Sequence, residues 1–212
     1  MDMQEQIYQI GIVPVVVLND AENAVPLAKA LRDGGLPCAE VTFRTDAAEE
    51  SIRRITEAFP EMLVGAGTVL TTEQADRAVK AGAKFIVAPG LNPVTVKHCQ
   101  EIGVPVFPGV LTPSEIEQAL SLGLKTVKFF PAEPAGGLPM IRAMAAAYVG
   151  VRFLPTGGIN AANVRDYLAD TKHILACGGS WMVKSAWIDA GEFDKIREMA
   201  AEAAGIVKEI RG

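Results

Sequence analysis

Short apolar runs alternate with amphipathic segments along the whole chain. The apolar runs are five to seven residues long and predict strands. Because strands that alternate with helices are joined by helical crossovers, the pattern predicts parallel pairing. The predicted strands are Ile12–Leu18, Cys38–Phe43, Leu63–Thr68, Lys84–Ala88, Val104–Pro108, Thr126–Phe130, Val151–Pro155 and His173–Cys177.

The intervening segments carry recognisable helix starts. The segment "TTEQADRAVKAG" has Thr71 or Thr72 as a cap and acidic residues in its first turn. The segment "TPSEIEQALSLG" opens with Thr112, and Glu115 follows three residues later, which is the spacing of a capping box. A further helical segment, Gln4–Ile10, precedes the first strand.

Eight strand–helix units in 212 residues, without a linker or a break in composition, predict a single domain over residues 1–212. Eight units favour closure into a (β/α)8 TIM barrel, in which the N-terminal helix closes the bottom, and an open parallel sheet is the alternative. Functional sites of such barrels lie at the C-terminal ends of the strands. In this chain those ends hold most of the Gly, Pro, Thr and charged residues that interrupt the apolar pattern.

Composition and charge narrow the function classes. A net charge of −5 without a basic run argues against nucleic acid as a partner. The acidic N-terminus lacks the apolar core of a signal peptide, and no apolar stretch approaches the length of a membrane span. The three cysteines are odd in number and follow no motif, which is typical of reduced thiols in a cytoplasmic protein.

The segment "TVKFFPAE" contains a lysine in the middle of an otherwise apolar strand. Because side chains alternate between the two faces of a strand, Val127 and Phe129 share one face and Lys128 points to the other, into the barrel. Burial of an unpaired charge is costly, so a lysine at this position calls for a reason.

The segment "EVTFRT" offers a partner for this lysine. Glu40 and Arg44 lie on the inward face of the second predicted strand, roughly 13 Å apart along it. This spacing predicts Glu40 at mid-depth in the barrel and Arg44 at its mouth.

Two interpretations of a Lys128–Glu40 pair remain open on the strand pattern. One is a structural ion pair that fills the barrel. The other is a desolvated lysine whose neutral amine attacks a carbonyl and forms a Schiff base, with the carboxylate moving protons.

Two glycine-rich turns, "PTGGIN" and "CGGSWMV", follow the last two predicted strands. The loops after strands seven and eight of a barrel are a frequent phosphate site, because their backbone N–H groups can bind an anion. The candidate phosphate-binding residues are Thr156, Gly157, Gly158, Gly179 and Ser180. Thr68 in "GAGTV" and Pro89 in "APG" end two earlier strands, at the same end of the barrel as Lys128. Turn chemistry alone is the alternative explanation for each of these residues.

The motifs "EVTFRT", "VGAGTV", "APG", "KFFPAE", "PTGG" and "GGSW" occur together, in order, from about Ile12 to Trp181. In this order and approximate spacing they resemble the 2-keto-3-deoxy-6-phosphogluconate (KDPG) aldolases, which are class I, Schiff-base aldolases of the Entner–Doudoroff pathway. The resemblance implies cleavage of KDPG to pyruvate and glyceraldehyde 3-phosphate by a homotrimer that needs no metal and no cofactor.

The resemblance also implies roles for single residues. Lys128 matches the Schiff-base lysine and Glu40 the general acid/base, which acts through a water. Arg44 and Thr68 match residues that hold the pyruvyl carboxylate. The residues that match the walls of the pyruvate pocket and the phosphate loops are Pro89, Phe130, Gly157, Gly158, Gly179 and Ser180.

Other functions compete with this one. Aldolases for 4-hydroxy-2-oxoglutarate or for the galactonate-derived epimer share the same motifs, and Asn19 and Asp20 stand where a cation would help to hold phosphate. Metal-dependent aldol chemistry needs a ligand cluster at the strand ends, where His98 and His173 are not expected. A non-catalytic assembly scaffold is the third alternative, since the helix "MIRAMAAAYV" could serve subunit contacts.

Overall fold

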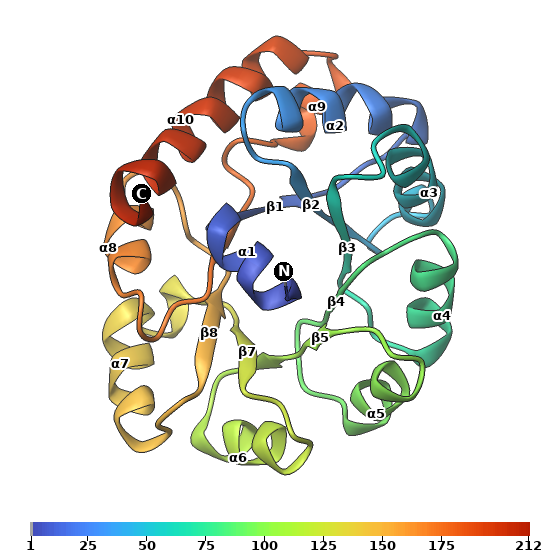
Figure 1. Cartoon of the computed structure of the whole chain (residues 1–212). Coiled ribbons are helices and arrows are strands. Elements are labelled where there is room, and N and C mark those ends of the chain that lie inside the picture. Colours follow the sequence, from blue (N-terminus) through green and yellow to red (C-terminus); the bar gives the residue numbers. More distant parts are fainter. Residues whose placement is uncertain (1) are drawn as a thin grey trace.

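The computed structural model describes residues 2–212, in which nine short strands form parallel pairs. One sheet has the order β5-β4-β3-β2-β1-β9 and the other the order β6-β7-β8. Figure 1 shows the strands curling around the centre of the molecule, with the helices outside. The strands are β1 (Ile12–Val16), β2 (Cys38–Thr42), β3 (Leu63–Gly67), β4 (Ile86–Val87), β5 (Val106–Phe107), β6 (Gly109–Val110), β7 (Thr126–Phe129), β8 (Arg152–Pro155) and β9 (Cys177–Gly179).

All the helices but the first cover the outer face of the curled sheet, as Figure 1 shows. The helices are α1 (Met3–Ile10), α2 (Ala24–Asp33), α3 (Ala48–Ala58), α4 (Thr72–Lys80), α5 (Pro93–Glu101), α6 (Pro113–Ser121), α7 (Gly137–Ala147), α8 (Val164–Ala169), α9 (Ser185–Asp189) and α10 (Phe193–Arg211), with short 3-10 turns at Ala21–Asn23 and Glu133–Ala135. Within residues 2–212, no helix combines the length and the apolar character that a membrane crossing requires.

Two strands differ from the sequence prediction. The predicted strand Val104–Pro108 is observed as β5 and β6, separated by Pro108, because proline has no N–H to donate to a neighbouring strand. The predicted strand His173–Cys177 is observed further along the chain, as β9, because regular pairing with β1 begins only at Cys177. Isolated parallel bridges, Phe153 with Ile174 and Thr156 with Gly178, connect this region to β8.

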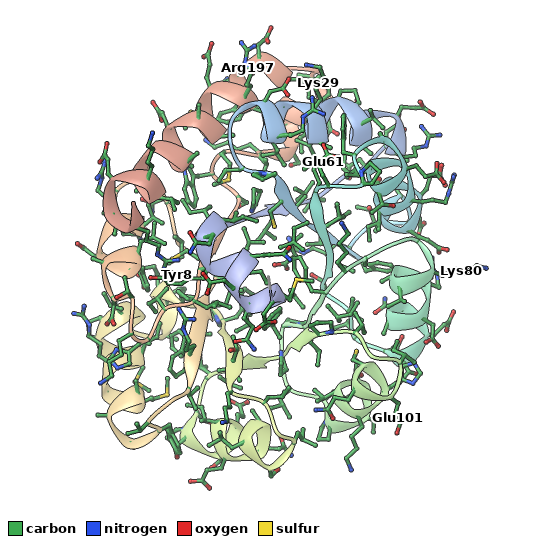
Figure 2. The ribbon with its side chains drawn as sticks, in the orientation of Figure 1. Tyr8, Lys29, Glu61, Lys80, Glu101 and Arg197 are labelled. Carbon is green, nitrogen blue, oxygen red and sulfur yellow. The ribbon has the colours of Figure 1, made fainter. Side chains whose placement is uncertain are left out.

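The predicted helix starts are confirmed. The Thr112 side chain accepts a hydrogen bond from the Glu115 N–H, and Glu115 bonds back to the Thr112 backbone, which completes the capping box. Thr71 caps α4 by accepting from Gln74 N–H. Figure 2 shows the polar side chains of the helices pointing outwards, for example Lys80 and Arg197.

Two apolar clusters build the core. The larger cluster lies between the sheet and the outer helices. The smaller cluster consists of Ile7 from α1 and residues in or just before the strands, namely Val13, Cys38, Leu63, Phe85, Val87, Phe107, Leu154, Leu175 and Ala176. Cys38 and Leu63 are the first residues of β2 and β3, so together with Ile7 they fill the end of the interior where these strands begin.

Helix α1 lies across the middle of the ring of strands in Figure 1. Gln4 accepts a hydrogen bond from the Thr126 hydroxyl at 2.9 Å, which connects α1 to β7. Arg211 of α10 donates to the Tyr8 carbonyl at 2.7 Å, and its guanidinium lies 4.2 Å from the centroid of the Tyr8 ring, labelled in Figure 2. These contacts hold the helix at the end of the sheet where the strands begin.

Candidate active site

Lys128 lies on β7 with only 4 % of its surface exposed, as the strand pattern predicted. Its register neighbours are Gly109 on β6 and Leu154 on β8. A glycine beside a long side chain leaves room on the inner face of the sheet. The backbone N–H of Lys128 donates to the Pro108 carbonyl at 2.9 Å, so the break between β5 and β6 does not loosen the strand that carries the lysine.

Glu40 lies on β2 and is fully buried. Its register neighbours are Val15 on β1 and Gly65 on β3. A Cβ atom on Gly67 would overlap Oε1 of Glu40 and would lie 2.7 Å from its Cγ, so the glycine makes the space that the carboxylate occupies. The second glycine of "VGAGTV" therefore leaves the space in which the Glu40 side chain lies.

The two side chains meet inside the sheet, with Lys128 Nζ 3.5 Å from Glu40 Oε1. A charge-assisted hydrogen bond is shorter, about 2.7–2.9 Å. In the described part of the chain neither carboxylate oxygen of Glu40 has a hydrogen-bond partner. A structural ion pair would need such partners to offset desolvation. The geometry therefore favours a pair that is available for chemistry over one that fills the interior.

We expect Gly67→Ala to lower activity far more than stability. The added methyl group displaces the end of the flexible Glu40 side chain and leaves the backbone in place, because Gly67 is already extended rather than in the left-handed region. The turnover number kcat should fall by about tenfold or more, whereas the free energy of unfolding should change by about 1 kcal/mol. Enzyme kinetics and urea unfolding measure the two quantities.

Gly205→Ala is the matched control, because a Cβ on this α10 residue meets no atom within 4 Å. A Gly67→Ala enzyme with wild-type kcat would show that the position of the Glu40 carboxylate does not matter for turnover.

Arg44 follows β2 and is held by the residues around it. The Thr42 hydroxyl donates to the Val16 carbonyl at 2.9 Å, and the Thr45 hydroxyl donates to the Leu18 carbonyl at 2.5 Å. Arg44 Nε then donates to the Thr68 hydroxyl at 3.3 Å. Thr68 has φ of 55°, an uncommon backbone conformation for a residue other than glycine. The structure thus brings together Arg44 and Thr68, as the sequence predicted.

A cavity of about 410 Å³ opens at the C-terminal ends of the strands. Its lining does not include Lys128 or Glu40, but Lys128 Nζ is 5.1 Å from the centroid of the Phe130 ring, which lines it. Val15, the register neighbour of Glu40, also lines it. The predicted site residues in the lining are Arg44, Phe130, Thr156, Gly157, Gly158, Gly179 and Ser180.

The turn after β8 is fixed by the segment that follows β7. The backbone N–H groups of Ala132 and Glu133 donate to the carbonyls of Thr156 and Gly157, at 2.8 and 3.0 Å. Gly158 has φ of 84°, and a Cβ on it would lie 2.5 Å from Glu133 Cβ. The Tyr167 hydroxyl donates to Glu133. Burial, together with this hydrogen bond, raises the pKa of Tyr167 well above its ordinary range. The motif "KFFPAE" thus positions the glycine turn as well as the lysine.

Pro89 was expected near the lysine, and Lys184 was not counted among the site residues. Pro89 lines a neighbouring cavity of about 330 Å³, and its carbonyl lies against Gly109, the register neighbour of Lys128. Lys184, which follows "GGSWMV" near the mouth of the sheet, lines the cavity of the predicted site. The signal that could have found it is its place four residues after Ser180, in the loop that follows the last strand.

The three cysteines are free, buried and dispersed over the fold. In residues 2–212 there is no group of three or more His, Cys, Asp or Glu side chains that could hold a metal ion. Burial raises the pKa of Cys99 to about 11 and that of Cys177 to about 12. Burial, followed by the nearby Glu40 charge, raises the pKa of Cys38 even further.

We therefore expect the native protein to be inert towards an aromatic disulfide reagent at pH 8, because the thiolate fraction of each cysteine is on the order of 10⁻³ or less. All three thiols should react once the chain is unfolded in urea, since their pKa then returns to the ordinary thiol value of 9.0. Absorbance of the released thiolate measures both reactions. Rapid reaction of the native protein would contradict the burial of the thiols.

Comparison with known proteins adds to this geometry. Residues 3–199 match the family described as "Aldolase: KDPG and KHG aldolase". The chain belongs to the KDPG and KHG aldolase family. It is 49 % identical to the 2-dehydro-3-deoxy-phosphogluconate aldolase of Treponema pallidum (strain Nichols), over 96 % of each chain.

Solved structures of other family members have the same fold. The KDPG aldolase of Legionella pneumophila, with pyruvate captured at low pH as a covalent carbinolamine intermediate, superposes with a TM-score of 0.90 at 37 % identity, over 94 % of this chain and 97 % of that one. The aldolase of Zymomonas mobilis ZM4, solved with 3-phosphoglycerate, gives a TM-score of 0.89 at 39 % identity, over 96 % of each chain.

Proposed function

We propose that this chain is a class I aldolase that cleaves KDPG to pyruvate and glyceraldehyde 3-phosphate through a Schiff base on Lys128. The observation that carries the proposal is the buried Lys128–Glu40 pair, whose carboxylate oxygens make no hydrogen bonds to residues 2–212, and whose lysine contacts Phe130 in the lining of an open cavity. Family membership and the carbinolamine of the Legionella relative support it.

In the proposed reaction the Lys128 amine adds to the C2 carbonyl of the sugar acid. Loss of water from the carbinolamine gives an iminium ion, which accepts the electron pair of the C3–C4 bond when that bond breaks. The enamine that remains takes up a proton at C3, and hydrolysis of the new iminium releases pyruvate and the free lysine.

Glu40 is the proposed acid/base of these steps. It removes the proton of the C4 hydroxyl as the aldehyde leaves, through a water, and it serves the proton transfers at the lysine nitrogen. Its distance of 3.5 Å from Nζ supports both tasks.

Arg44, with Thr68 beside it, is proposed to bind the pyruvyl carboxylate through charge-assisted hydrogen bonds. Phe130 and Pro89 are proposed as walls of the pyruvate pocket. The proposed phosphate residues are the hydroxyls and glycines at the far side of the cavity, namely Thr156, Gly157, Gly158, Gly179 and Ser180.

We also propose that the curled sheet is a closed (β/α)8 barrel, that α1 closes its bottom, and that residues 1–212 form one domain. Two features support closure of the barrel. The strands β5 and β6 can be taken as one strand interrupted at Pro108, and isolated bridges join β8 to the β9 region. The contacts of α1 with the inner apolar cluster support its closing role. A homotrimer follows from family resemblance, and free buried cysteines support a cytoplasmic location.

The test is a pyruvate-release assay with four substrates: KDPG, its galactonate-derived epimer, the unphosphorylated 2-keto-3-deoxygluconate, and 4-hydroxy-2-oxoglutarate. We expect the highest kcat/KM with KDPG, by about tenfold or more over the unphosphorylated acid. A higher kcat/KM with 4-hydroxy-2-oxoglutarate than with KDPG would make 4-hydroxy-2-oxoglutarate the preferred substrate. Release of pyruvate from none of them would refute the proposed function and leave the assembly scaffold.

A further inference from the structure

Among residues 2–212, Arg44 and Lys184 are the charged residues that line the cavity, and both are cations. Neither forms an ion pair with any residue between 2 and 212, whereas other cations, such as Arg53 and Arg77, pair with glutamates on the protein surface. Two cations that face one cavity without a carboxylate raise its affinity for anions, because a bound anion is attracted by both. The cavity is therefore suited to a ligand with a negative group at each end.

The chain segment before Lys184 directs it to the cavity. The Val183 N–H donates to the Ser180 carbonyl at 3.1 Å, which turns the chain back after β9. Trp181 packs over Gly179, where a Cβ would overlap its ring. These contacts fix the loop, so Lys184 and Ser185 line the same cavity as Gly179 and Ser180.

Trp187 holds the Lys184 ammonium without neutralising it. Lys184 Nζ lies 4.8 Å from the centroid of the indole, and Lys195 Nζ lies 4.3 Å from it. Lys195 also pairs with Glu192 at 2.8 Å, whereas Lys184 has no such acidic partner within residues 2–212. A cation–π contact leaves the N–H donors of an ammonium available for an anion.

The nearest acidic residue along the chain does not compete for Lys184. Asp189, at the end of α9, accepts a hydrogen bond from the Asn19 side chain at 2.9 Å. The charged residues in the lining are Arg44 and, from the loop after the last strand, Lys184.

We infer that Lys184 determines specificity by binding the anionic group at the far end of the substrate, while Arg44 binds the carboxylate near Lys128. The inference rests on the proposed function and names the phosphate monoester of a sugar acid as the preferred far group. A phosphate monoester carries nearly two negative charges and three acceptor oxygens, which suits an ammonium beside hydroxyls and backbone N–H groups.

The experiment compares Lys184→Met with wild type on KDPG and on the unphosphorylated acid. The ratio of the two kcat/KM values, which expresses the preference for phosphate, should fall by about 10- to 100-fold, with most of the change in KM for KDPG. Lys184→Arg should restore most of the preference, because it keeps the charge. Lys195→Met is the matched control, since it removes the other ammonium from Trp187 outside the cavity, and its ratio should equal that of wild type.

Calorimetry with inorganic phosphate separates this inference from the proposed function. The dissociation constant of phosphate should rise by about tenfold or more in Lys184→Met, whether or not the wild-type protein cleaves KDPG. An unchanged substrate ratio, or an unchanged phosphate affinity, would overturn the role of Lys184. A larger loss for 4-hydroxy-2-oxoglutarate than for KDPG would also overturn it, because the far group would then be a carboxylate.

Discussion

Replacing Lys128 with methionine should lower kcat for aldol cleavage by about 10⁴-fold or more. The thioether cannot add to a carbonyl, so the covalent step is lost while the shape of the buried side chain is nearly kept. Release of pyruvate from KDPG, followed with a coupled dehydrogenase, measures the loss. The single variant should also lose stability, because Glu40 is left as an unpaired buried carboxylate.

Two further variants make this result interpretable. Lys128→Met combined with Glu40→Gln should recover the stability that the single variant loses, without recovering activity, because both charges are then removed. Lys125→Met is the control for lysine loss, since Lys125 is exposed just before β7 and should leave kcat unchanged. Residual activity of Lys128→Met near the wild-type level would assign the chemistry to another group.

Replacing Glu40 with glutamine should lower kcat by about 10²- to 10⁴-fold, because the amide has the same size but cannot accept a proton. Formation of the Schiff base with pyruvate should persist in this variant, since the amine is still present beside Phe130 in the cavity lining. Exchange of the pyruvate methyl protons for deuterium, followed by NMR, isolates the proton transfer and should slow by a similar factor.

Glu115→Gln is a suitable control, because Glu115 accepts hydrogen bonds from the Leu111 and Thr112 N–H groups at the start of α6 and does not line the cavity. Exchange at the wild-type rate in Glu40→Gln would show that a different group moves the proton.

The pair at the centre of the site could be predicted from the sequence because strand alternation is a local rule. Alternation alone gave the inward direction of Lys128 and of Glu40, and parallel strands bring their C-terminal ends to one edge. The capping box at Thr112 was predictable for the same reason, since it depends on residues three positions apart.

What the sequence could not give depends on contacts between distant segments. The break at Pro108 and the late start of β9 are decided by which neighbouring residues can pair, not by hydrophobicity. The separate cavity of Pro89 follows from the packing of apolar loop residues around it. Lys184 was not counted among the site residues because the turn between Ser180 and Val183, which has no periodic pattern, sets its position.

Borohydride reduction in the presence of pyruvate, followed by peptide mass mapping, shows which lysine forms the Schiff base. The wild type should give a single reduced pyruvyl adduct on Lys128, and Lys128→Met should give none. No adduct, or an adduct on a different lysine such as Lys184, would contradict the assignment of the Schiff base to the buried amine of β7.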